Sequence, residues 1–407
     1  MQTRGELTRR GWALLVTAVA AAGAGYLVGV VELYPLAAGA VVLVLSARAW
    51  VGARAWDVRA SRAIRPARVP AGYEARVFVS VYNHDTRRSP VLVVRDAFAD
   101  GRAAGAFAVA PLASGESRSA AYRLPAPRRG VVEFDPLGIE VCDPFGLARV
   151  TRTVAPAASL TVHPRVDLLP HGTIPSDSER DQQFSVPLLG RGGDEFYALR
   201  EYQAGDDLRQ VHWVSSARTD ELMIRQPQNL WRGRTTIVLD ARAPVHDRQS
   251  FEETLSAAAS LAVSGLRGGM QVRLIVVGGH DTGFGMGAGH EARVLDILAV
   301  ASPTTGGTMS AELRRAGARG TVVLVTTDGA PMGDLSAAAR ANGLSDAVIV
   351  VIGRAASGEH AGGTRRMAAI AAGAGGRCSV VRVGPGTSFV DAWVARDRRP
   401  VASAARR

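Results

Sequence analysis

The stretch Thr-Thr-Ile-Val-Leu-Asp at residues 235–240 is a run of β-forming residues that ends in an aspartate. Four comparable runs follow, at residues 272–277, 321–326, 347–352 and 379–383. Strands without polar alternation are typical of parallel sheets that are buried on both faces. Helical periodicity separates the runs, at residues 250–266, 291–300, 334–341 and 364–373. We therefore predict a doubly wound α/β domain over residues 231–398.

Two aspartates, Asp240 and Asp328, follow strands of this predicted sheet. Sites of doubly wound sheets lie at the carboxyl ends of strands, where these carboxylates would converge. Converging carboxylates repel each other unless a cation lies between them, and the Arg242 guanidinium can take that place. The alternative is that Arg242 points to solvent and the aspartates cap neighbouring helices.

This placement resembles the metal-ion-dependent adhesion site of von Willebrand A-type domains, where an Asp-x-Ser-x-Ser turn and a later aspartate coordinate Mg²⁺. Asp240 matches the first position and Asp328 the last, but Arg242 and Pro244 stand at the serine positions. Magnesium prefers an octahedral shell of oxygen ligands. We therefore expect a degenerate site at Asp240, Arg242 and Asp328 that binds no metal, although Thr304 or Thr305 could supply an intervening threonine.

A second stretch, residues 190–226, concentrates charges, aromatic residues and turn residues. We expect two strands, residues 196–202 and 222–226, joined by a turn at residues 205–207 that caps a short helix. Its charges fit a structural ion-pair network or a partner-binding surface at a domain seam, and catalysis is the alternative. The candidate residues are Arg200, Glu201, Tyr202, Gly205, Asp206, Asp207, Arg209, His212, Trp213 and Arg218.

The order Arg-Glu-Tyr, Gly-Asp-Asp-x-Arg, His-Trp, Ala-Arg and Ile-Arg-Gln in this stretch resembles the signature of domain-of-unknown-function family 58. Members of that family are commonly membrane-anchored, carry a von Willebrand factor A-like domain, and are encoded near MoxR-type AAA+ ATPases. The resemblance implies this architecture and such an ATPase as partner. It implies no reaction.

The N-terminal part of the chain predicts a transmembrane hairpin followed by a basic juxtamembrane segment, together residues 1–64. Apolar runs at residues 12–31 and 36–50 are the candidate spans, and a signal peptide is the competing interpretation of the first. Arginines lie before the first run and after the second, whereas the turn between them carries only Glu32. The positive-inside rule then places the bulk of the chain in the cytoplasm, at the plasma membrane of a bacterium. The basic flank should also bind anionic headgroups.

Residues 65–168 alternate polar and apolar residues between turn signals, which predicts an all-β sandwich. Strands are expected at residues 74–82, 90–95, 117–124 and 131–134, with a last strand toward residue 164. Residues 143–147 predict a tight turn, in which we expect Phe145 and Leu147 to pack into the core. Residues 169–230 hold a proline-containing linker and the signature segment, and residues 399–407 form a basic tail.

Composition excludes several kinds of chemistry. The formal net charge is +11, and every basic residue other than histidine is arginine. Walker A phosphate binding, Schiff-base chemistry and Ser-Lys nucleophiles are therefore excluded. Cys142 and Cys378 lie in different predicted domains, which argues against a disulfide scaffold. The arginines lack interleaved aromatic residues, so we expect no nucleic-acid binding, and no motif indicates a cofactor.

The sequence favours a membrane-anchored, non-catalytic scaffold that would act with a MoxR-type AAA+ ATPase in envelope complex assembly. One alternative is a hydrolase that uses Asp206, Asp207 and His212. Another is an adhesion or ligand-binding module that keeps a metal at Asp240 and Asp328. A pocket with convergent groups around the signature would favour the hydrolase, and metal binding would favour the adhesion module.

Overall fold

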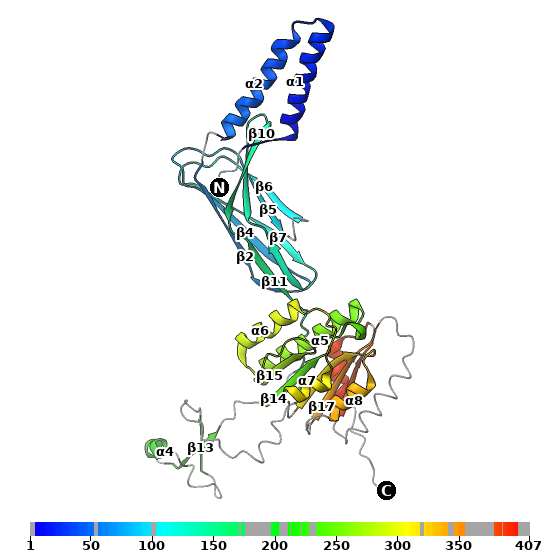
Figure 1. Cartoon of the computed structure of the whole chain (residues 1–407). Helices are drawn as coiled ribbons and strands as arrows, with labels where there is room; N and C mark the ends of the chain where they lie inside the picture. The colour runs from blue at the N-terminus through cyan, green and yellow to red at the C-terminus, as the bar shows by residue number, and fades with distance from the viewer. Residues whose placement is uncertain are drawn as a thin grey trace. The chain divides into compact units, whose positions relative to one another are not determined.

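The chain folds into two compact units, Met1–His163 and Pro164–Arg407, which are described separately (Figure 1). The structure is a computed structural model, and the residues that it describes are 5–52, 56–98, 103–170, 172–175, 197–202, 211, 213–219, 221–227, 233–317, 321–340, 346–354, 378–384 and 386–397. The predicted helix at residues 364–373 and the predicted basic tail lie outside the described residues.

The first unit begins with a helical hairpin, α1 (Arg9–Val28) and α2 (Leu33–Gly52), which lie side by side in Figure 1. Each helix has 20 residues, which at 1.5 Å per residue is about the thickness of a bilayer's hydrocarbon core. Both are long and apolar enough to cross a membrane. The expected pair of apolar N-terminal helices is therefore present.

The buried residues of the hairpin have two kinds of neighbour. In α1 the buried residues are Gly11, Ala18 and Gly25, and α2 buries Ala37, Val44, Ala47 and Val51. A Cβ atom at Gly25 would lie 3.3 Å from Leu33 at the start of α2, so a small residue lets the two helices approach closely there. Gly11 instead lies against Leu147, and Val44, Ala47 and Val51 pack into the core of the sheets that follow. Most other large apolar side chains of the hairpin are exposed.

The hairpin is attached to the sheet that follows it through the residue that begins α1. Thr8 caps the helix by accepting a hydrogen bond from the Gly11 amide at 3.2 Å. Its own amide donates to the Leu147 carbonyl oxygen at 2.9 Å, and its hydroxyl donates to the Gly146 carbonyl oxygen at 2.6 Å. Just before it, β1 (Glu6–Leu7) pairs with β10 (Ala148–Ala155) as the edge of the sheet.

Two sheets make up the rest of the first unit. One has the order β1-β10-β9-β5-β8-β11-β3, with β6 paired to β5, and the other has the order β2-β4-β7. The remaining strands are β2 (Val58–Arg65), β3 (Arg68–Pro70), β4 (Tyr73–Asn83), β5 (Leu92–Phe98), β6 (Ala103–Val109), β7 (Ser117–Ala126), β8 (Gly130–Phe134), β9 (Leu137–Cys142) and β11 (Ala158–His163). Alternate residues of both sheets enter one hydrophobic core. All five strands predicted for this region are present, as β4, β5, β7, β8 and β11.

Residues 58–65 differ from the prediction, because they form β2 rather than part of a basic flank. Arg62 lies in the inward-facing register of this strand, and its side chain is only 2% exposed. The guanidinium forms an ion pair with Asp96 and lies 5.0 Å from the centre of the Phe134 ring. Tyr122 donates a second hydrogen bond to Asp96 at 2.7 Å. Arg62 is therefore an interior residue that cannot bind headgroups.

The predicted turn at residues 143–147 is present, but only one of its two apolar residues is in the core. Leu147 is 6% exposed and packs inside, whereas Phe145 is 63% exposed. The Asp143 carboxylate accepts hydrogen bonds from the amides of Phe145 and Ala148, at 2.8 Å and 2.6 Å. This pair of bonds closes the turn with Phe145 at its tip, which corrects the expectation that both side chains are buried.

The second unit contains a parallel sheet of five strands in the order β15-β14-β16-β17-β18. The strands are β14 (Arg234–Leu239), β15 (Gln271–Val276), β16 (Thr321–Thr327), β17 (Asp346–Ile352) and β18 (Cys378–Val383). Their side chains alternate between two hydrophobic clusters. One cluster includes residues of α5 (Arg248–Arg267), α6 (Gly287–Val300) and α10 (Phe389–Asp397), and the other includes residues of α7 (Met309–Arg315) and α8 (Met332–Arg340). Helices thus cover both faces, as the continuous apolar strands predict.

Residues 164–175 pack against the helices of this second unit. Ser264 of α5 accepts a hydrogen bond from the Leu169 amide at 3.0 Å, and Trp393 of α10 donates to the Thr173 hydroxyl at 3.1 Å. Leu169 and Ile174 are buried in the core beside α5. The first residues of the segment that the sequence suggested as a linker are therefore part of the folded unit.

The attachment of α1 to the sheet predicts the effect of a single methyl group. A Cβ atom at Gly11 would lie 2.2 Å from the Leu147 carbonyl oxygen, whereas one at Gly23 would meet nothing within 4 Å. Gly11→Ala should therefore destabilise the first unit by on the order of 1–3 kcal/mol through overpacking. Thermal unfolding of the full chain in detergent, with Gly23→Ala as control, measures this effect. Equal melting temperatures for the two variants would show that the contact is unimportant.

Candidate functional site

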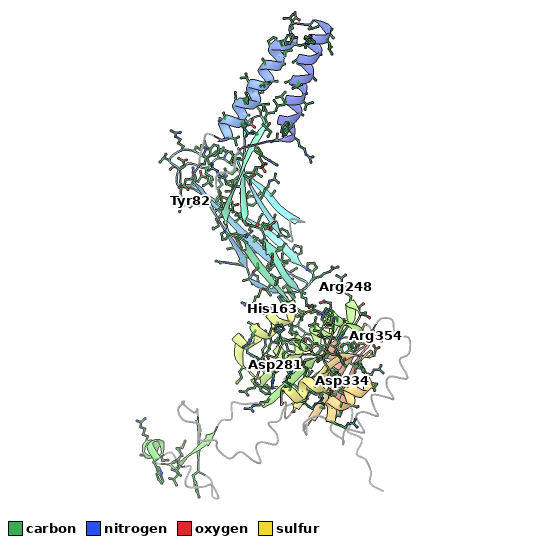
Figure 2. All side chains as sticks on the ribbon, in the orientation of Figure 1. Tyr82, His163, Arg248, Asp281, Asp334 and Arg354 are labelled. Carbon is green, nitrogen blue, oxygen red and sulfur yellow. The ribbon has the colours of Figure 1, made fainter. Side chains whose placement is uncertain are left out.

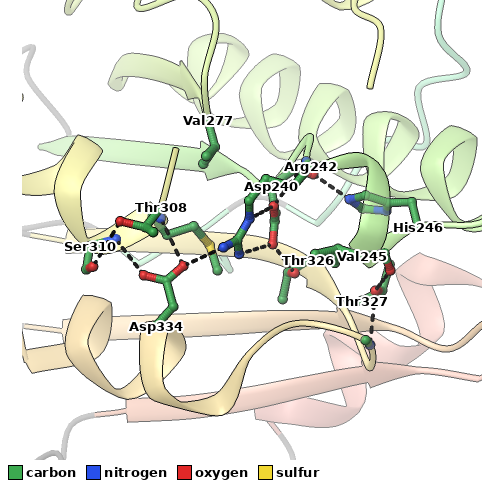
Figure 3. A network of polar contacts seen from close by, with 12 residues as sticks. Asp240, Arg242, Val245, His246, Val277, Thr308, Ser310, Thr326, Thr327 and Asp334 are labelled. Atoms are coloured by element: carbon green, nitrogen blue, oxygen red, sulfur yellow. Dashed lines mark hydrogen bonds and ion pairs between the residues drawn. The ribbon is translucent and has the colours of Figure 1, made fainter. Parts of the chain in front are cut away.

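The strand order of the second unit reverses beside β14, which pairs with β15 on one side and β16 on the other. Parallel sheets of this kind have their sites where the order reverses, at the carboxyl ends of the strands. Asp240 directly follows β14, and Asp328 directly follows β16. Figure 3 shows the polar network at this position.

Asp240 is fully buried, and hydrogen bonds occupy both of its carboxylate oxygens. Oδ1 accepts from Nε of Arg242 at 2.8 Å and from the Arg242 amide at 3.3 Å. Oδ2 accepts from Nη2 of Arg242 at 2.8 Å and from the Thr326 hydroxyl at 2.8 Å (Figure 3). These four bonds use the acceptor capacity of the carboxylate, so no oxygen of Asp240 is left for another ligand.

The Arg242 guanidinium also contacts a second carboxylate, that of Asp334 in the first turn of α8. Nη1 lies 3.0 Å from Oδ2 of Asp334, and the two side chains are 11% and 8% exposed. Asp334 in turn accepts hydrogen bonds from the Met309 and Ser310 amides, at 3.1 Å and 3.2 Å, where α7 begins. Through Arg242, the network connects β14, β16, α7 and α8.

The electrostatic environment of Arg242 favours its charged form, as its ion pairs with Asp240 and Asp334 require. The pKa of Arg242 is raised above its usual value, chiefly by its hydrogen bond to Asp240, while burial acts in the opposite direction. A guanidinium presents its donors in a planar fork that can serve two carboxylates, unlike the point charge of a lysine. Arg242 thus stays charged and supplies the cation that two adjacent buried carboxylates require.

The predicted pairing of Arg242 with Asp328 is wrong, because Asp328 has another partner. Its Oδ1 accepts from Nε of Arg354 at 2.8 Å, and Oδ2 accepts from the Arg354 amide at 3.4 Å. Arg354 follows the end of β17, the strand next to β16, so the pair joins two adjacent strand ends. Figure 2 labels Asp334 and Arg354 on the second unit.

Three residues of the network were not found from the sequence. Asp334 comes from a helix whose approach to β14 no sequence spacing reveals, and Thr326 looked like an ordinary strand residue. His246 is the third: its Nε2 lies 2.7 Å from the carbonyl oxygen of Asp240. Burial lowers the pKa of His246 below its usual range, so the ring is neutral and Nε2–H donates to that oxygen.

Thr304, one of the two threonines considered as a further metal ligand, bonds to residues other than Asp240. The Thr304 hydroxyl donates to the Val277 carbonyl oxygen at 3.0 Å. The Thr304 backbone joins the loop after β14, because its amide donates to the Ala241 carbonyl oxygen at 2.7 Å. Across the described part of the chain, no three His, Cys, Asp or Glu residues are grouped as a metal ion would need.

The signature segment is described only in part. β12 (Tyr197–Glu201) pairs with β13 (Met223–Pro227), so the two predicted strands are present, and α4 (Trp213–Thr219) lies between them in the chain. Trp213 is 67% exposed, and Arg218 is also exposed. Arg200 and Glu201 belong to β12, opposite Ile224 and Met223, and Tyr202 follows them. The candidates outside the described residues are Gly205, Asp206, Asp207, Arg209 and His212.

Neither cysteine is suited to nucleophilic chemistry at neutral pH. Both are free thiols, one in each unit. Burial raises the pKa of Cys378 to about 11. Burial and a hydrogen bond to Glu140 raise the pKa of Cys142 to about 11 as well. Because the thiolate is the nucleophile, both residues are essentially unreactive at pH 7.

The fold and the network together define an α/β domain whose strand-end site is occupied by an internal ion pair. Residues 198–356 match the family model described as "Protein of unknown function DUF58", and this part of the chain belongs to that family. The match begins in β12 and extends just past Arg354, so it includes the signature segment and the whole polar network. No curated protein matches the chain.

Several solved structures resemble parts of the chain. The CARDB domain of a Pyrococcus furiosus protein is 16% identical, with 26% of this chain and 93% of that chain covered and a TM-score of 0.22. A β-glucosidase from Listeria innocua is 12% identical over 26% of this chain and 16% of its own, with a TM-score of 0.19. The alkylpurine DNA glycosylase AlkC from Pseudomonas fluorescens is 15% identical over 32% and 38%, with a TM-score of 0.19. Such TM-scores carry no argument about fold or function.

The network predicts that Arg242 matters far more for stability than an exposed arginine. Arg242→Ala leaves two buried carboxylates without their cation, which should cost on the order of 3–5 kcal/mol. Arg267 pairs with Glu291 at 2.9 Å, but its side chain is 53% exposed, so Arg267→Ala should cost at most about 1 kcal/mol. Denaturant unfolding of the two variants, followed by circular dichroism, makes the comparison. Similar losses for both would contradict the central role of Arg242.

Proposed function

We propose that this chain is a membrane-anchored, non-catalytic scaffold or adaptor that acts with a MoxR-type AAA+ ATPase, in the assembly or maturation of an envelope complex. In this proposal α1 and α2 cross the plasma membrane of a bacterium, and both units lie in the cytoplasm. The two sheets of the first unit form a β-sandwich, and the second unit is a von Willebrand A-like domain whose metal site has been lost.

The saturated network at Asp240 is the observation that carries the non-catalytic part of this proposal. An α/β domain of this kind would use the strand-end site for metal or ligand, and here a guanidinium occupies it. The four hydrogen bonds to the Asp240 carboxylate leave it no capacity to coordinate a cation or to accept a proton from a substrate. The two poorly nucleophilic thiols support the same conclusion.

Membrane anchoring is supported by the length of the two helices and by the charges at their ends. Arg9 and Arg10 at the start of α1 and Arg48 near the end of α2 are exposed, whereas the turn between the helices carries only Glu32. This asymmetry favours an arrangement with both helix ends and the folded units on the cytoplasmic side. The partner is proposed from the resemblance to the family that residues 198–356 belong to.

A metal titration tests the occupied site. Calorimetry of the full chain in lipid nanodiscs should give no saturable heat with millimolar Mg²⁺ or Mn²⁺, because Arg242 cannot be displaced by a metal without leaving its own charge buried. Thermal stability should be unchanged as well. Asp240→Asn serves as the control for non-specific heat. Saturable binding by the wild type that this control lacks would mean that the second unit is a metal-dependent module.

A binding measurement tests the adaptor role. We expect nanodiscs that carry the full chain to bind a purified MoxR-type ATPase of the same organism when it is trapped in its ATP-bound state. Empty nanodiscs are the control. Absence of binding in every nucleotide state would contradict the adaptor role, and a hydrolytic activity of the chain alone would favour the alternative that uses Asp206, Asp207 and His212.

A further inference from the structure

The turn between β9 and β10 exposes an aromatic side chain on a backbone that several hydrogen bonds hold in place. The Asp143 carboxylate is buried and holds the amides of Phe145 and Ala148. The Gly146 amide donates to the Asp143 carbonyl oxygen at 3.0 Å, and Gly146 has a φ of 68° that suits a residue without a side chain. Phe145 is nevertheless 63% exposed. A rigid turn thus presents an apolar residue to its surroundings.

The same turn is bonded to the beginning of α1. Thr8 donates its hydroxyl hydrogen to the Gly146 carbonyl oxygen at 2.6 Å and its amide hydrogen to the Leu147 carbonyl oxygen at 2.9 Å. The approach at Gly11 is so close that a Cβ atom there would overlap the Leu147 carbonyl. These bonds hold the turn that carries Phe145 beside Thr8, the residue that caps the start of α1.

The first turn of α1 carries residues that suit the boundary between lipid and water. Arg9 and Arg10 are exposed, and Trp12 is 60% exposed. Trp12 follows Thr8 by four residues, which is about 6 Å along the helix axis. The polar interfacial layer on each side of a bilayer is roughly 5–8 Å thick. Tryptophan and other amphipathic aromatic residues concentrate in this layer, and arginines bind headgroups there.

We propose that the β9–β10 turn, with Phe145 at its tip, inserts into the interfacial layer of the membrane that α1 and α2 cross. This inference rests on the proposed membrane anchoring. The turn gives the first unit a third membrane contact besides the two helices, and it fixes the orientation of the sheets relative to the bilayer. The ligand is the lipid surface itself, because the turn is continuous with the proposed membrane-spanning segment through the bonds of Thr8.

Tyr73 offers a matched control, because it is an equally exposed aromatic residue at the other end of the same unit. It is 66% exposed and begins β4. The other end of that strand, Asn83, pairs with Val58, six residues after the end of α2. Figure 2 shows Tyr82 near the helices at that end. With about 3.3 Å per residue along a strand, Tyr73 should lie some 30 Å farther from the membrane.

Site-directed spin labelling of the full chain in nanodiscs with anionic lipid tests the proposal. Single cysteines are placed by Phe145→Cys, Pro144→Cys, Tyr73→Cys and Val19→Cys after replacement of Cys142 and Cys378 by alanine. Collision rates with oxygen, which concentrates in lipid, and with a water-soluble nickel complex report the depth of each label. Phe145 and Pro144 are both exposed, so either label can report without disturbing the core.

The proposal predicts that labels at residues 144 and 145 favour oxygen severalfold over nickel relative to the label at residue 73. The label at residue 19, near the middle of α1, should lie in lipid. A lipid-exposed label at residue 19 with residues 144 and 145 as aqueous as residue 73 would overturn the insertion of the turn while leaving the anchor intact. An aqueous label at residue 19 would overturn the membrane anchor itself. A label at residue 145 that is aqueous until the ATPase is added would identify the turn as a protein contact and contradict the proposal.

Discussion

The buried guanidinium of Arg242, which bonds to the carboxylates of both Asp240 and Asp334, makes the interaction on which the arrangement of the second unit depends. Without a cation between them, two buried carboxylates at one edge of a sheet would repel each other. A guanidinium satisfies both, and its planar donors also fix the distance between β14 and the first turn of α8. Because Asp334 also caps the start of α7, one charged side chain sets the positions of two helices on the same face of the sheet.

A buried ion pair is a costly way to stabilise a fold, because desolvation of the charges offsets much of their attraction. Its value here is specificity of position. In the A-type architecture that we propose for this unit, a metal ion at such a position would be able to leave or be exchanged. A guanidinium that belongs to the chain cannot leave, so the loops around Asp240 are held in one arrangement.

The sequence predicted features that depend on neighbouring residues and missed those that depend on distant ones. The strand at residues 234–239 was predicted from the β-forming run at residues 235–240, and the Asp240–Arg242 pair was predicted because its members are two residues apart. Asp334 was missed because only the packing of α8 brings it to β14. The strand β2 was not predicted because it contains three arginines. Arginine is normally a surface residue, so nothing in the sequence pattern indicated that Arg62 alternates into the interior. Phe145 looked like a core residue because the sequence does not show that a buried aspartate turns it outward.

The most direct test of this account is a double-mutant cycle between Arg242 and Asp334. The variants Arg242→Met, Asp334→Asn and their combination are compared with the wild type by denaturant unfolding of the full chain. If the fork links β14 to α8 as the geometry indicates, the double variant should be less destabilised than the two single losses added together, by about 0.5–3 kcal/mol. Strict additivity would show that Arg242 and Asp334 act independently, and would contradict the claim that one internal cation organises this edge of the sheet.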